Sequence, residues 1–251
     1  MIELVYKPRA RSLRHYVVSE ESLGALDPAQ IPETALNVLA DVAEILNDFK
    51  VLHYVCDGTL LGIVRDDGFI PGDGDIDFRV DRSALTNELI DAFKAEGFFA
   101  YKQSVIEGRL TNVGLFRDGL LVDLYVAVFA NHSVMFELIF RKNHLSYQQA
   151  FDGVEPMQFH GVDVNVPRHA SEHLRACFGP DWQQPTKTWD SFFSHKALCR
   201  CTGGAKGLLA AGMRFQTARR LRVRDVSSRR SWHRVRDALR LVSWVRRPDR
   251  T

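Results

Sequence analysis

The residues best suited to chemistry lie in the segment DGTLLGIVRDDGFIPGDGDIDF, residues 57–78. Asp75 and Asp77 are separated by one apolar residue, so a strand here projects both carboxylates from one face, with Asp73 just before them at the same edge. Like charges this close raise the pKa of at least one carboxyl unless a cation lies between them, and the usual cation is Mg²⁺ or Mn²⁺ with oxygen ligands. The spacing therefore predicts a metal site.

A further carboxylate, Asp123, lies within the apolar run LLVDLYVAVF. An unpaired carboxylate buried in such a strand is costly or is forced to stay neutral, so Asp123 needs a partner, and the predicted metal ion supplies one. We predict Asp75, Asp77 and Asp123 as catalytic residues, and these three together with Asp73 as the metal ligands. A solvated, calcium-like loop or a turn rich in Asp and Gly is the alternative for residues 72–77 taken alone.

Gly58 and Thr59 form a candidate binding site for a phosphate group. They open a predicted short helix, and backbone amides at a helix N-terminus bind anions, helped by the positive end of the helix dipole. Arg65, after that helix, is a second candidate phosphate contact, and its alternative role is a surface ion pair with Asp66 or Asp67. Carboxylates for metal and a helix start for phosphate together predict metal-assisted phosphoryl transfer.

Helical and extended patterns alternate around this segment. Apolar residues at the spacing of one helical face predict a helix over residues 31–50, with Pro32 in its first turn. We predict further helices over residues 60–64, 83–96 and 168–178, strands over 51–56, 75–80, 98–103, 110–116, 120–129 and 134–140, and a hairpin over 157–166 that turns at His160 and Gly161. This order predicts an α/β (α+β) fold with a mixed sheet flanked by helices.

The composition excludes several classes of protein. The 251 residues are 45% hydrophobic and 25% charged, which is not the balance of a fibrous or wholly disordered chain. No apolar run approaches the roughly 18 residues that cross a bilayer, no secretory signal is evident, and four cysteines without a CxxC pair favour a reducing, cytoplasmic setting. HExxH, GxSxG, Walker A and GxGxxG motifs are absent. We interpret His169 and His173 as a solvated helix face.

Charge divides the chain into an acidic body, residues 1–200, and a basic extension, residues 201–251, with Gly203 and Gly204 as a hinge. The extension has 14 Lys and Arg residues against three acidic ones. Apolar residues recur there at helical spacing among arginines, which predicts that residues 205–251 bind an anionic membrane surface. Packing of the apolar stripe on the body is the alternative, and we do not expect nucleic-acid binding.

Three motifs together resemble the LicD and fukutin family of phosphotransferases, a branch of the nucleotidyltransferase fold shared with DNA polymerase β. DGTLLGIVR followed by GFIPGDGDIDF resembles the family's signature, VDLYVAV its third-carboxylate strand, and VDVNVPRHASEHLRACFGPDW followed by QQP its closing helix and turn. The match covers residues 31–186. The resemblance implies transfer of a phospho-alcohol, such as phosphocholine, ribitol phosphate or glycerol phosphate, from a CDP-linked donor to a hydroxyl of a cell-surface glycan or its lipid-linked precursor.

The resemblance also implies roles for single residues. Asp75 and Asp77 correspond to the family's metal carboxylates, Asp123 to the third and Asp73 to an additional ligand, while Arg65 occupies the position of the family's arginine. The acceptor hydroxyl would attack the distal phosphorus and CMP would leave, with Asp123 either accepting the hydroxyl proton or sharing a metal ion. One departure is the sequence at residues 72–74, Gly-Asp-Gly, where many members have Trp-Asp.

Two alternative functions stay open at this point. A nucleotidyltransferase that moves an NMP from an NTP onto a small molecule or macromolecule would use the same carboxylates and release pyrophosphate instead of CMP. A membrane or nucleic-acid adaptor would use the basic extension and would not need Asp75 or Asp77. In each case we expect a cytoplasmic protein, peripheral at the inner face of the membrane where the extension binds it.

Overall fold

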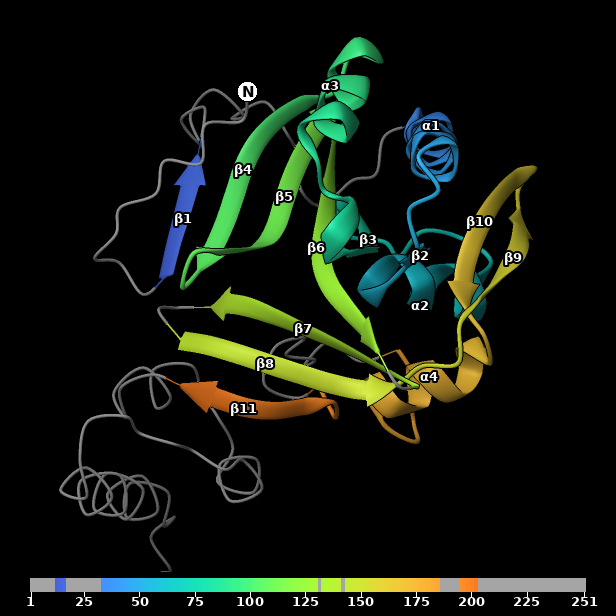
Figure 1. The fold of residues 1–251 in the computed structure, drawn as a ribbon. Coiled ribbons are helices and arrows are strands. Elements are labelled where there is room, and N and C mark those ends of the chain that lie inside the picture. The colour runs from blue at the N-terminus through green and yellow to red at the C-terminus, as the bar shows by residue number, and fades with distance from the viewer. Residues whose placement is uncertain (1–11, 17–32, 131, 141–142, 186–194, 203–251) are drawn as a thin grey trace, which may run out of the picture.

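A computed structural model describes residues 12–16, 33–130, 132–140, 143–185 and 195–202 of the chain. Within these ranges its main feature is a nine-stranded mixed sheet (Figure 1). The strands are β1 (Ser12–Tyr16), β2 (His53–Val55), β3 (Asp75–Asp81), β4 (Phe99–Ile106), β5 (Arg109–Arg117), β6 (Leu120–Ala130), β7 (Ser133–Phe140), β8 (Asn143–Ala150) and β11 (Leu198–Thr202). Strands β1, β4, β5, β6, β7, β8 and β11 follow one another as neighbours, while β3 pairs in parallel with β6 and antiparallel with β2.

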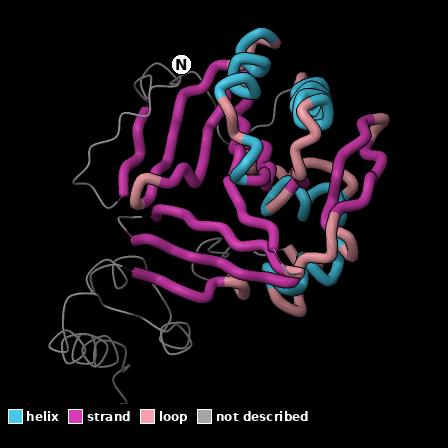
Figure 2. The backbone as a smooth tube through the Cα atoms, in the orientation of Figure 1, coloured by secondary structure: helices cyan, strands magenta, loops and turns pink. Residues whose placement is uncertain are grey.

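Four α-helices and a second, two-stranded sheet accompany the nine-stranded sheet in the described part of the chain. They are α1 (Ala35–Asp48), α2 (Asp57–Asp66), α3 (Asn87–Ala95), α4 (Ala170–Phe178) and the hairpin of β9 (Val154–Phe159) and β10 (Val162–Pro167). In Figure 1, α1, α2, α4 and the hairpin occupy one side of the molecule. Figure 2 shows that β7, β8 and β11 cross the direction of β4 and β5, because the sheet twists and bends along the long strand β6.

The core explains why α1 and the sheet hold together. Val38, Leu39, Val42 and Leu46 recur at helical spacing and are fully buried, so α1 presents one apolar face to the central cluster that also contains Phe78 of β3. Burial of each such side chain contributes about 1.5–3 kcal/mol. This packing fixes the path from α1 through β2 into α2, the segment that carries the predicted phosphate site.

The predicted class, an α+β fold with a mixed sheet flanked by helices, is confirmed. The helix predicted over residues 31–50 covers Ala35–Asp48, and residues 31 and 32 lie outside the described part of the chain. The predicted hairpin is β9 and β10, and both residues of its turn, His160 and Gly161, have the positive φ that such a turn requires.

Other predictions about elements were wrong. The helix predicted over residues 83–96 is a 3₁₀ turn (Arg82–Ala84) followed by α3. Two caps cause the break, because the Asp81 side chain accepts a hydrogen bond from the Ser83 amide and the Thr86 side chain accepts one from the Leu89 amide. Strands β1, β8 and β11 were not predicted at all.

The structure describes only the first two residues of the predicted extension, 201 and 202. The boundary at residue 200 falls within β11, which pairs with β8. Gly203, Gly204 and the membrane-binding segment predicted over residues 205–251 lie outside the described residues. Among the residues that are described, no helix has the length and apolar character needed to cross a membrane.

Candidate active site

Three carboxylates come together where β3 and β6 run in parallel. The register places Asp77 directly opposite Asp123, and Asp75 lies two residues earlier on the same face of β3. One ligand oxygen from each of these residues lies within 4.8 Å of the others. Hard divalent cations take oxygen ligands of this kind. The structure thus brings together three of the four predicted metal ligands.

Burial makes Asp75 and Asp77 costly to ionise without a cation. Asp77 is 7% exposed, and its Oδ1 has no hydrogen-bond partner among the described residues. Burial, followed by the charges of Asp73 and Asp123, raises the pKa of Asp75 to about 7. Burial and then the charge of Asp75 raise the pKa of Asp77 well above its ordinary value. A divalent cation would relieve both costs, so these residues fit the metal that the sequence predicts.

Asp73, the fourth predicted ligand, lies outside this group of three and against the start of α2. A Cβ atom added to Gly58 would collide with Asp73 Oδ2, so glycine at this position leaves room for the carboxylate. Burial raises the pKa of Asp73, although a hydrogen bond with Asp75 opposes the shift. The observed role of Gly58 is therefore close approach to Asp73, while its contact with phosphate stays a prediction.

Thr59, the other half of the predicted phosphate turn, is buried and has a structural partner. Its hydroxyl oxygen accepts a hydrogen bond from the Asp77 backbone amide at 2.9 Å. This bond ties the first turn of α2 to the strand that carries the carboxylates. Thr59 thus acts on the site by holding Asp77 in place, and a direct contact of Thr59 with a ligand stays a prediction.

Arg65 adopts the ion pair that the sequence offered as its alternative role. Its Nε and Nη2 donate to the two oxygens of Asp66 at 2.8 Å and 2.6 Å, which is a bidentate pair. Both residues line the same cavity as Asp75. This pair engages Nε and Nη2 of Arg65 but not Nη1, and a contact of Arg65 with phosphate stays a prediction.

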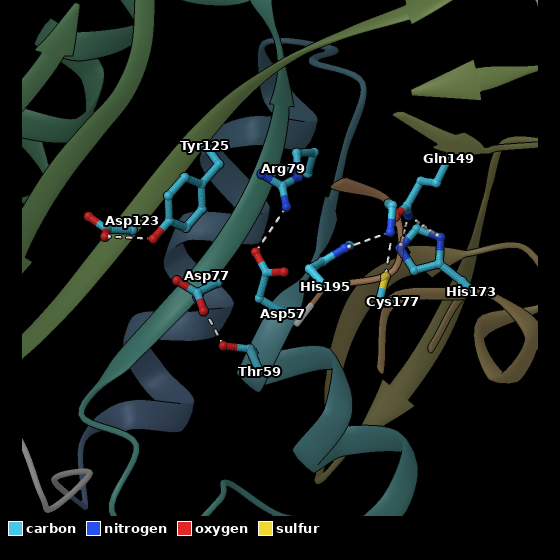
Figure 3. A network of polar contacts seen from close by, with 11 residues as sticks. Asp57, Thr59, Asp77, Arg79, Asp123, Tyr125, Gln149, His173, Cys177 and His195 are labelled. Carbon is cyan, nitrogen blue, oxygen red and sulfur yellow. Dashed lines mark hydrogen bonds and ion pairs between the residues drawn. The ribbon is translucent and has the colours of Figure 1, made fainter. Parts of the chain in front are cut away.

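Sequence reasoning missed several charged residues that surround the carboxylates. Lys102 Nζ of β4 lies 2.7 Å from each oxygen of Asp123, and the Tyr125 hydroxyl donates to Asp123 Oδ2 at 3.2 Å. Arg79, fully buried in β3, donates to Asp57 at 2.9 Å (Figure 3). Burial opposes ionisation of Asp57, but the Arg79 guanidinium outweighs it and lowers the pKa of Asp57. An arginine between the apolar residues Phe78 and Val80 of a predicted strand was the available signal, because a buried cation needs a carboxylate partner.

Asp75 and Asp77 open onto a cavity of about 1300 Å³. Its polar lining includes Asp57, Asp73, Asp75, Asp77, Arg65, His195 and Lys196, and its aromatic lining includes Phe69, Tyr125, Phe136, Tyr147, Phe178 and Trp182. These residues come from α2, from β3 and the loop before it, from strands β6, β7 and β8, and from the end of α4 and the segment after it. A cavity of this volume is large enough for a nucleotide-sized ligand.

The interpretation of His169 and His173 as a solvated face was wrong for His173. This side chain is buried and hydrogen-bonds the amide of Gln149 in β8. Gln149 also accepts a hydrogen bond from the Cys177 thiol, one turn further along α4. Helical spacing alone did not distinguish the two faces, because the polar partner lies on a strand that the sequence pattern did not predict.

A family model described as "LicD/FKTN/FKRP, nucleotidyltransferase domain" matches residues 50–169, a range that includes all four predicted metal ligands. Relatives named ribitol-5-phosphate transferase FKTN, from Mus musculus, Macaca fascicularis and Homo sapiens, are each 24% identical to the chain over 201 residues. The match covers 75% of this chain but 41% of each relative, so the chain corresponds to less than half of their length. Residues 50–169 are thus similar to the LicD/FKTN/FKRP nucleotidyltransferase domain and form a domain of the LicD type.

Proposed function

We propose that this chain transfers a phospho-alcohol from a CDP-linked donor to a hydroxyl of a cell-surface glycan or its lipid-linked precursor, with Mg²⁺ or Mn²⁺ as cofactor. The observation that carries the proposal is the group of Asp75, Asp77 and Asp123 beside a nucleotide-sized cavity in a LicD-type domain. The names of the relatives support the reaction class, since they are ribitol-5-phosphate transferases. We further propose that the mixed sheet has the nucleotidyltransferase arrangement that the family description names.

The three carboxylates would hold the cation, and Asp73 would join them as an additional ligand. When bound, the divalent ion supplies positive charge to the phosphate oxygens as the leaving CMP takes up negative charge. Lys102 and Tyr125 hold the Asp123 side chain of β6, which lies beside Asp75 and Asp77 of β3. Asp123 is thus held beside the site where an acceptor hydroxyl would lose its proton.

The start of α2 would receive the phosphates. Backbone amides of its first turn carry the positive end of the helix dipole, and Gly58 allows close approach of an oxygen-bearing group, as the position of Asp73 illustrates. Arg65 would contribute a second positive charge by exchanging Asp66 for a phosphate oxygen. Phosphate oxygens and carboxylate oxygens compete for the same guanidinium geometry.

Release of CMP tests this proposal. The purified chain with Mg²⁺ is incubated with CDP-choline, CDP-ribitol, CDP-glycerol or CDP-ethanolamine, and slow transfer to water should release CMP from one of them. Asp75→Asn should abolish the release, whereas Asp91→Asn, an exposed aspartate of α3 paired with Lys94, should not. Pyrophosphate from NTPs without CMP release would instead favour a nucleotidyltransferase. Full function without Asp75 and Asp77 would favour an adaptor.

We also propose that residues 205–251 bring the enzyme to the inner face of the membrane, where a lipid-linked acceptor is available. The amphipathic spacing and the excess of arginine in the extension support this location. The full chain should pellet with anionic vesicles in a salt-sensitive way, and a chain lacking residues 205–251 should not. Equal behaviour of the two chains would contradict the proposal.

A further inference from the structure

His195 lines the cavity and carries a buried hydrogen-bond donor that has no partner among the described residues. The side chain is 6% exposed and lies in the segment between α4 and β11. Its Nδ1 accepts a hydrogen bond from the Ala197 backbone amide at 3.1 Å, so Nδ1 carries no proton and Nε2 must carry one when the ring is neutral (Figure 3). Nε2 has no hydrogen-bond partner in the described part of the chain. A buried N–H without an acceptor is costly, which points to a ligand that accepts from it.

The ring of His195 is held neutral and in one orientation. Burial lowers its pKa to about 4, so Nε2–H is a donor at neutral pH without a positive charge. Tyr147 meets the ring edge-on at 5.1 Å and Phe136 at 6.0 Å, and both line the same cavity. The donor is therefore fixed in direction before a ligand arrives.

A hydrogen-bond acceptor, Asp57, lies between His195 and the metal ligands (Figure 3). Asp57 lines the cavity and interacts electrostatically with His195 on one side and with Asp77 on the other. Figure 3 shows the labelled side chains of Asp123, Asp77, Asp57 and His195 following one another across the site. A fixed donor and a carboxylate acceptor next to each other match a hydroxyl group, which both accepts and donates.

This end of the cavity is poorly suited to a quaternary ammonium group. Arg79 already pairs with Asp57, and its guanidinium carbon lies 3.5 Å from the centre of the Phe136 ring. The aspartate charge and one aromatic face are thus both engaged by a buried cation. A second cation would lose the attraction that an aromatic cage normally provides.

We propose that Asp57 and His195 form a binding subsite for a neutral, hydroxyl-bearing group of the substrate, in which His195 Nε2 donates to the hydroxyl and Asp57 accepts from it. The inference rests on the proposed function. Either the polyol that is transferred or the ribose of the nucleotide carries this chemistry, and both are attached to a phosphate that the neighbouring metal carboxylates would engage.

Calorimetric titration with CDP-glycerol, CDP-choline and CMP, each with Mg²⁺, tests the subsite on the full chain. His195→Phe keeps an aromatic ring but removes the donor, and should weaken CDP-glycerol binding about five- to tenfold. His195→Gln retains an N–H donor and should restore most of that loss. His173→Phe is the matched control, since His173 is also a buried histidine but does not line the cavity. It should leave all three affinities unchanged, and thermal unfolding reports how far each variant is destabilised.

The pattern across the probes identifies the hydroxyl. Weaker binding of CDP-glycerol alone would place the transferred polyol at His195, and equal weakening of all three probes would place the ribose there. No weakening by His195→Phe, or weakening of CDP-choline alone, would overturn the inference while the proposed function stands. If the unaltered chain binds none of the three probes, the proposed function fails and the subsite fails with it.

Discussion

The buried carboxylate of Asp77 is suited to metal binding but does not stabilise the metal-free chain. Asp77 is buried, one of its oxygens lacks a hydrogen-bond partner among the described residues, and its pKa is raised. Asp77→Asn removes the charge, so the metal-free variant should melt at the same or a higher temperature. Stabilisation by Mg²⁺ should be lost and CMP release should fall at least about 100-fold.

Melting curves with and without Mg²⁺ check this prediction. Asp91→Asn on the exposed face of α3 is the control and should keep both the Mg²⁺ response and CMP release. A marked fall in the melting temperature of metal-free Asp77→Asn would show that the carboxylate stabilises the fold, contrary to the argument from burial.

Thr59 offers a second test on a single residue. Its structural role rests on one hydrogen bond, which the Asp77 backbone amide donates to the Thr59 hydroxyl. Thr59→Val keeps the shape but leaves the buried Asp77 amide without an acceptor, which should lower the free energy of unfolding by about 1–3 kcal/mol. Thr59→Ser retains the hydroxyl and should lose much less. Urea unfolding of the two variants measures the difference, and equal losses would mean that the hydrogen bond contributes little.

At the scale of elements, sequence patterns predicted the features that depend only on residues close together in the chain. The apolar face of α1 and the turn of the β9–β10 hairpin follow from spacing and turn chemistry within a few residues. The strand β8, NHLSYQQA, was missed because it buries Leu145 and Tyr147 between polar residues that read as a loop. The break before α3 was missed because two capping side chains compete with a continuous helical pattern.

The contact between α2 and the loop before β3 yields a prediction about backbone packing. A Cβ atom on Gly62 would collide with the Gly68 carbonyl oxygen and crowd Ile70, both in the segment that lines the cavity. Because backbone cannot move aside as a side-chain tip does, Gly62→Ala should destabilise the chain by about 1–3 kcal/mol and weaken nucleotide binding. Gly68→Ala, which would make only an ordinary contact, is the control for chemical denaturation and titration.

At the scale of the whole molecule, the site depends on contacts between distant parts of the chain. The parallel pairing of β3 with β6 sets Asp77 beside Asp123, and β4 brings Lys102 to the same carboxylate. The carboxylates themselves were predictable, because their residue types and strand positions are local features. Their cationic partners and His195 were not, since nothing in the spacing of one segment reveals which distant side chain the sheet order places against it.

The balance between protons and metal yields the last prediction, which concerns stability against pH. The pKa of Asp75 is raised to about 7, so the metal-free fold binds a proton more tightly than the unfolded chain does. Its contribution to stability is therefore present at low pH and is lost as the pH rises from about 4 through 7. Mg²⁺ competes with that proton, so the rise in melting temperature caused by Mg²⁺ should be larger at pH 8 than at pH 5.5.

His173 and His195 act in the opposite direction, because burial lowers their pKa values to about 3 and about 4, and their stabilising effect is lost as the pH falls below about 6.5. That loss affects the metal-free and metal-bound protein alike, so the difference between melting curves with and without Mg²⁺ isolates the carboxylates. In Asp75→Asn the difference should be small and nearly independent of pH. An equally large Mg²⁺ effect at pH 5.5 and pH 8 in the unaltered chain would mean that the ion does not displace a proton from these carboxylates, and that it binds elsewhere.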